Sequence, residues 1–124
     1  MSEYKSFKSL AVWNKAMDLT DEVYKLVKLF PKEETYCLSD QLRRAVISIP
    51  SNIAEGYKRN SDKEYIQFLS IANGSCAEVE TQILIAIRQN IITAEEAGPA
   101  MALIDEIPRM LNSLIKKIKL RSQL

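Results

Sequence analysis

The sequence predicts an all-α protein, an up-down-up-down antiparallel four-helix bundle. Apolar residues recur every three or four positions in four long segments, which is the spacing of amphipathic helices. The 124 residues include only three glycines and four prolines, too few for a turn-rich β fold. The connections between the later segments are short, so consecutive helices must run antiparallel. At this length we expect residues 1–124 to form a single domain around one core.

The first helix is expected over residues 9–30. Its apolar side chains lie at helical spacing, and they are Leu10, Trp13, Ala16, Met17, Leu19, Val23, Leu26, Val27 and Phe30. Pro31 should end it, because the residue before a proline is disfavoured in the α conformation. The polar residues 32–35 then connect it to the next helix.

The second helix is expected over residues 38–58, with a kink where Pro50 removes one backbone hydrogen bond. The third should begin at a capping box formed by Ser61 and Glu64 and run to about residue 90. Gly74 lies in its middle, where we expect a neighbouring helix to cross closely.

The fourth helix should begin at a second capping box, Thr93 and Glu96, and bend at Pro108. The third and fourth helices also carry more apolar residues than one core requires, which predicts a second buried face and self-association. These additional residues are Ile66, Ile71, Ala77, Leu84, Ile85, Leu103, Met110 and Leu120. The alternative is that they are single exposed side chains, which are ordinary on protein surfaces.

The composition narrows the function classes. The chain contains no histidine, so histidine-based metal sites, catalytic triads and the usual general base near neutral pH are unavailable. Cys37 and Cys76 are far apart and form no Cys-x-x-Cys motif, so we expect neither a zinc site nor a redox pair. We therefore expect no enzyme, no cofactor and no metal. The start of the chain is too polar for a signal peptide and no apolar run would span a membrane, so we expect a cytoplasmic protein.

The charge is unevenly distributed although the net charge is only +1. After Glu106 the chain carries five basic residues and no acid, whereas residues 1–106 carry 12 bases against 16 acids. A basic carboxy-terminal segment of this kind has two interpretations. Its cations can pair with the helix dipole and face solvent, or they can contact nucleic acid. The candidate nucleic-acid-binding residues are Arg43, Arg44, Lys58, Arg59, Lys116, Lys117, Lys119 and Arg121.

Polar residues also follow one face of the second and third helices at helical spacing. They are Arg44, Ser48, Asn52 and Glu55 on the second, and Ser75, Glu78 and Gln82 on the third. We interpret Arg44, Ser48, Asn52, Glu55, Ser75 and Glu78 as a structural polar network that fixes helix register. Alternatives are a ligand or partner site, a solvent-facing surface, and a two-carboxylate acid/base or magnesium site at Glu55 and Glu78.

Several of these segments together resemble one protein family. The matching residues are Phe7, Leu10, Val12, Trp13 and Ala16, then Phe30, Pro31 and Glu34, then the run QLRRAVISIPSNIAEG from Gln41 to Gly56, then Phe68, Leu69, Ala72, Gly74, Ser75 and Glu78. This pattern is similar to the small bacterial four-helix bundle proteins encoded in intervening sequences of large-subunit ribosomal RNA genes. The accessory variability determinant of diversity-generating retroelements is related to them.

The resemblance implies a homopentamer, five bundles arranged as a ring around a central channel, without an established enzymatic activity. The retroelement relatives imply nucleic-acid binding and a reverse-transcriptase-like partner. We therefore expect a non-enzymatic, oligomeric scaffold or accessory protein that binds RNA or DNA. The alternative is a protein-interaction or structural oligomer without nucleic-acid binding, which the near-neutral net charge favours.

Overall fold

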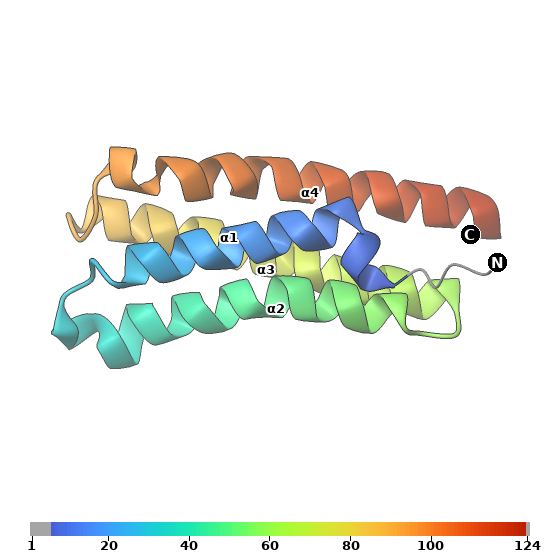
Figure 1. The fold of residues 1–124 in the computed structure, drawn as a ribbon, viewed down its shortest axis with the longest axis horizontal. Coiled ribbons are helices and arrows are strands. Elements are labelled where there is room, and N and C mark those ends of the chain that lie inside the picture. Colours follow the sequence, from blue (N-terminus) through green and yellow to red (C-terminus); the bar gives the residue numbers. More distant parts are fainter. Residues whose placement is uncertain (1–5, 124) are drawn as a thin grey trace.

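The computed structural model describes residues 6–123, which form four long helices and no strand (Figure 1). The helices are α1 (Ala11–Val27), α2 (Asp40–Tyr57), α3 (Asp62–Arg88) and α4 (Ala94–Ser122). The all-α class predicted from the sequence is therefore confirmed. None of the helices in this part of the chain is long and apolar enough to cross a membrane.

Consecutive helices run antiparallel, and α1 and α3 each pack against both α2 and α4 (Figure 1). The segment before α1, the α2–α3 turn and the end of α4 lie at the same end of the bundle. The α1–α2 and α3–α4 connections lie at the opposite end. Residues that are far apart in sequence therefore meet at each end.

The first helix is shorter than expected at both ends. A single 3₁₀ turn, Phe7–Ser9, precedes α1, and α1 ends at Val27. Beyond it the backbone tightens, because the amide of Leu29 donates to the carbonyl of Leu26 at 2.9 Å and that of Phe30 to Val27 at 3.0 Å. The predicted polar connection forms a 3₁₀ turn (Lys32–Glu34) and a π-helical turn (Thr35–Ser39) that leads into α2.

The two predicted capping boxes differ. At the start of α4, the Glu96 amide donates to the Thr93 hydroxyl at 3.0 Å and the Thr93 amide to the Glu96 carboxylate at 2.8 Å, so this box is confirmed. At the start of α3, the Ser61 hydroxyl accepts from the Glu64 amide at 3.1 Å without the return bond. Ser61 is therefore a simple N-cap, and the predicted box is only half formed.

The prolines do not interrupt the helices. α2 is continuous through Pro50, so no local unwinding occurs there, and α4 contains both Pro99 and Pro108. Pro50 is buried against the other helices. Packing of the neighbouring helices around Pro50 therefore compensates for the hydrogen bond that this proline cannot donate.

All four helices contribute to one apolar core. Its largest fully buried side chains are Leu19, Leu42, Ile49, Ile53, Leu69, Ile83, Ile107, Leu111 and Ile118. Met17, expected in this core, is 39% exposed, because it points about 100° around the helix from the buried Ala16.

The predicted second apolar face is only partly exposed. Ile66, Leu103 and Met110 pack against the core, whereas Ile71, Leu84, Ile85 and Leu120 are exposed large apolar side chains.

The close helix approach occurs at Gly56 and not, as expected, at Gly74. A Cβ atom at Gly56 would lie 2.8 Å from the Cβ of Phe68, whereas one at Gly74 would meet no atom within 4 Å. Gly56 is in the last turn of α2, next to the tight turn into α3, where the two backbones converge. Gly74 lies on the exposed side of α3.

Candidate nucleic-acid interface

Exposed lysines gather at the end of the bundle that holds the α2–α3 turn and the end of α4. They are Lys58, Lys63, Lys116, Lys117 and Lys119, and we call these five residues the basic end. None of them forms an ion pair with a residue in 6–123. Their ammonium groups are therefore available to phosphate oxygens. Lys8, which sequence reasoning did not include, lies in the 3₁₀ turn at the same end.

The three lysines of α4 point in different directions. Successive residues of a helix point about 100° apart, so Lys117 lies to one side of Lys116 and Lys119 to the other. Lys117 lines a groove between α1 and α4. The α4 lysines thus spread over about 160° of the helix circumference and do not form a single flat patch.

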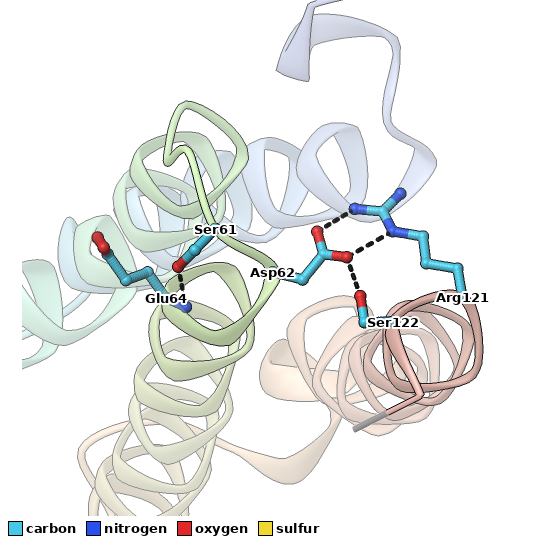
Figure 2. Close-up of polar contacts among 5 residues, drawn as sticks. All are labelled: Ser61, Asp62, Glu64, Arg121 and Ser122. Carbon is cyan, nitrogen blue, oxygen red and sulfur yellow. Dashed lines mark hydrogen bonds and ion pairs between the residues drawn. The ribbon is translucent and has the colours of Figure 1, made fainter.

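Two of the four candidate arginines, Arg59 and Arg121, lie at the basic end, and both already have acidic partners. Arg121 donates from Nη2 to Asp62 Oδ1 at 2.7 Å and from Nε to Asp62 Oδ2 at 3.1 Å, and the Ser122 hydroxyl donates to the same carboxylate (Figure 2). The hydrogen bonds from Arg121 and Ser122 lower the pKa of Asp62 from its ordinary value. Arg121 therefore joins α4 to α3 in this structure.

Arg59 is held in a similar way. Its Nη2 lies 2.6 Å from Glu55 Oε2, and its guanidinium carbon lies 4.6 Å from the centre of the Phe68 ring. Such stacking on an aromatic face fixes the side chain across the α2–α3 turn. The lysines therefore carry the candidate interface, with Arg59 and Arg121 as its structural supports.

Arg43 and Arg44 do not join the basic end. They lie near the start of α2, about 20 Å from Lys58 at a rise of 1.5 Å per residue. Arg44 pairs with Asp40 at 3.2 Å on the same helix. The structure therefore places these two candidate binding residues apart from the α4 lysines, and the two groups do not share one surface of the chain.

The predicted polar network forms only around two serines. Ser48 Oγ and Ser75 Oγ are 2.8 Å apart, and Asn52 Nδ2 donates to Ser48 Oγ at 2.9 Å and to its carbonyl at 2.7 Å. This cluster links α2 to α3. Arg44 and Glu55 instead pair along α2 with Asp40 and Arg59, so they lie outside it.

The two carboxylates considered for acid/base or metal chemistry are separated. Measured from the Ser48–Ser75 contact, Glu55 lies seven residues toward the α2–α3 turn and Glu78 three residues away from it, which is about 15 Å along the bundle axis. Within residues 6–123, no three potential ligands among Cys, Asp and Glu gather in one place. The structure therefore does not assemble the two-carboxylate site.

Fold and surface together define the class of protein: a small all-helical bundle that carries five exposed lysines without ion-pair partners among residues 6–123 at one of its ends. The chain belongs to the 23S rRNA-intervening sequence protein family, whose sequence model matches residues 8–113. It is also similar to a protein of unknown function from the S23 ribosomal protein family of Bacteroides thetaiotaomicron, solved by crystallography at 1.70 Å. The two chains are 29% identical with a TM-score of 0.79, over 86% of this chain and 99% of that chain. None of the curated proteins compared with the chain matches it.

Proposed function

We propose that this protein is a non-catalytic cytoplasmic scaffold that binds the backbone of RNA or DNA through its basic end. The observation that carries the proposal is the set of five lysines without acidic partners at one end of the bundle. Contacts between lysines and phosphates carry no sequence information, so this binding should be strong at low salt and indifferent to sequence.

Self-association forms the second part of the proposal. Ile71 and Ile85 are 52% and 42% exposed on α3, about 21 Å apart along the helix, and contact with another copy would remove both side chains from water. A closed ring of five copies, as the family resemblance implies, would cover such a face and repeat the basic end around an axis. A reverse-transcriptase-like protein is the partner that we propose for this assembly. The competing function is a structural oligomer that binds no nucleic acid, which the net charge of +1 favours.

Charge reversal at the basic end tests nucleic-acid binding. Replacing Lys116, Lys117 and Lys119 with Glu should weaken binding to RNA and DNA duplexes of unrelated sequence alike, and should flatten the salt dependence of the affinity. The matched control replaces Lys28, Lys32 and Arg88 with Glu, which changes the net charge equally at the opposite end of the bundle. Equal losses in the two variants, or no binding by the wild type, would contradict the proposal.

Light scattering during size-exclusion chromatography tests self-association. A ring of five 14.1 kDa chains would give a mass of about 70 kDa. A mass of one chain would contradict the ring. The ratio of absorbance at the nucleic-acid and protein maxima, before and after a high-salt wash, shows whether the assembly carries nucleic acid.

A further inference from the structure

A groove of about 540 Å³ runs between the start of α1 and the second half of α4, and nothing described so far occupies it. Leu10 and Val12 line it from the α1 side, and Arg109, Met110, Ser113 and Lys117 from α4. We call this cavity the α1–α4 groove. It lies next to the basic end, because Lys117 belongs to both.

One wall of the groove is cationic and polar. Arg109, Ser113 and Lys117 follow each other at intervals of four residues, so their side chains lie on the same side of α4. The two cations are about 12 Å apart along the helix. A ligand that satisfies both must carry negative charge at more than one point, as a nucleic-acid strand does.

The carboxylates near the groove are already paired. Glu106, which lines it, forms an ion pair with Lys15 of α1 at 3.2 Å. Asp105 lies 2.9 Å from Arg109, but both side chains are 73% exposed, and an exposed pair of this kind exchanges readily for another anion. α1 adds a favourable field, because its first turn contains no acidic residue and its N-cap side chain makes no hydrogen bond.

We propose that the α1–α4 groove binds the sugar-phosphate backbone of a nucleic acid, with Arg109 and Lys117 contacting separate phosphates and the Ser113 hydroxyl donating a hydrogen bond between them. This inference rests on the proposed function and extends it. The backbone path continues from the basic end along α4, and Arg109 becomes a binding residue that the sequence did not single out as one. The apolar residues of the groove fit sugar carbons and make no base-specific contact.

Two arginines with matched surroundings test the charge contact. Arg109→Gln and Arg44→Gln each remove one exposed guanidinium that pairs with an aspartate four residues earlier, Arg109 in the middle of α4 and Arg44 near the start of α2. With a fluorescein-labelled DNA duplex at low salt, Arg109→Gln should weaken binding roughly tenfold, as expected for one charged hydrogen bond. It should also reduce the slope of log affinity against log salt by about 0.9. Arg44→Gln should leave both quantities unchanged.

A second pair of variants tests, without a change of charge, whether the nucleic acid occupies the groove. Ser113→Tyr places a ring in the α1–α4 groove, and Ser70→Tyr places one on the exposed side of α3. We expect Ser113→Tyr to weaken duplex binding severalfold and Ser70→Tyr to have no effect. Melting curves of both variants verify that each is folded, since both serines are exposed.

The outcomes separate this inference from the proposed function. If the wild type binds the duplex and the lysine reversals weaken it, but Arg109→Gln and Ser113→Tyr behave like their controls, the groove is not used and the basic end alone binds. If the wild type binds no duplex at low salt, both proposals fail. Losses in Arg109→Gln and Ser113→Tyr, with both controls unaffected, establish the groove.

Discussion

Arg121 in the last turn of α4 donates two hydrogen bonds, of 2.7 and 3.1 Å, to the carboxylate of Asp62 in the first turn of α3 (Figure 2). The two residues are 59 positions apart in the sequence. Each charge also suits its helix end, because an acid stabilises the start of a helix and a base stabilises its end. The pair therefore closes the basic end of the bundle, and it removes one cation from the residues that could contact a phosphate.

This pair predicts a loss of stability in acid. Because its partners favour the ionised form, the pKa of Asp62 is lower in the folded protein than its ordinary value of 3.8. Its contribution to stability is complete above that value and is lost as the pH falls through the lowered folded pKa. Asp62→Asn should therefore lower the melting temperature near neutral pH and flatten its decline in acid.

The control for this prediction is Asp105→Asn, which removes an exposed ion pair within one helix. Such pairs contribute little, so its melting temperature should change less than that of Asp62→Asn. Equal shifts in the two variants would show that the Arg121–Asp62 pair stabilises the fold no more than an exposed ion pair within one helix.

Two glycines should respond to alanine in opposite directions. The added Cβ at Gly56 would lie 2.8 Å from Phe68 Cβ and 3.2 Å from the carbonyl oxygen of Tyr65, so the α2–α3 turn must shift. Gly56→Ala should lower the free energy of unfolding by about 1–3 kcal/mol. Gly74→Ala meets no atom within 4 Å and should raise it by up to about 1 kcal/mol. Urea denaturation measures both, and an unchanged Gly56→Ala midpoint would contradict the close approach.

The serine contact between α2 and α3 should show coupling. Removing one hydroxyl of the Ser48–Ser75 pair, 2.8 Å apart, should cost about 1 kcal/mol of unfolding free energy. Ser48→Ala should cost more than Ser75→Ala, because Asn52 Nδ2 also loses an acceptor. A double-mutant cycle measures the interaction energy, expected at about 0.5–1 kcal/mol. Additive effects of the two substitutions would mean that the bond does not stabilise the fold.

The two cysteines should differ in reactivity. Burial raises the pKa of the Cys76 thiol to about 12, so its reactive thiolate is scarce, whereas Cys37 is exposed. A thiol reagent at mildly alkaline pH should modify Cys37 alone in the native protein and both cysteines after denaturation. Mass spectrometry of the labelled chain locates the modification. Rapid labelling of Cys76 in the native state would indicate that the core opens.

Much of the fold was predictable because its signals are local. The spacing of apolar residues indicated all four helices, and Thr93 and Glu96 marked the start of α4. The candidate interface was less predictable. The lysines of α4 follow from charge counting, but the separation of Arg43 and Arg44 from them depends on which end of the bundle each residue occupies.

The sequence by itself determined the helical class, the order of the elements, the concentration of basic residues after Glu106 and the absence of histidine chemistry. Only the tertiary structure decided which side chains meet between helices: Arg121 pairs with Asp62, and Ser48 contacts Ser75. It also placed the close approach of two helices at Gly56 and not at Gly74. Arg109 and Lys117 line the same groove for the same reason. The physical reason is the distance along the chain over which each interaction acts. Periodicity and capping act over about four residues along one helix, whereas contacts between helices depend on how each is rotated and shifted against its neighbours.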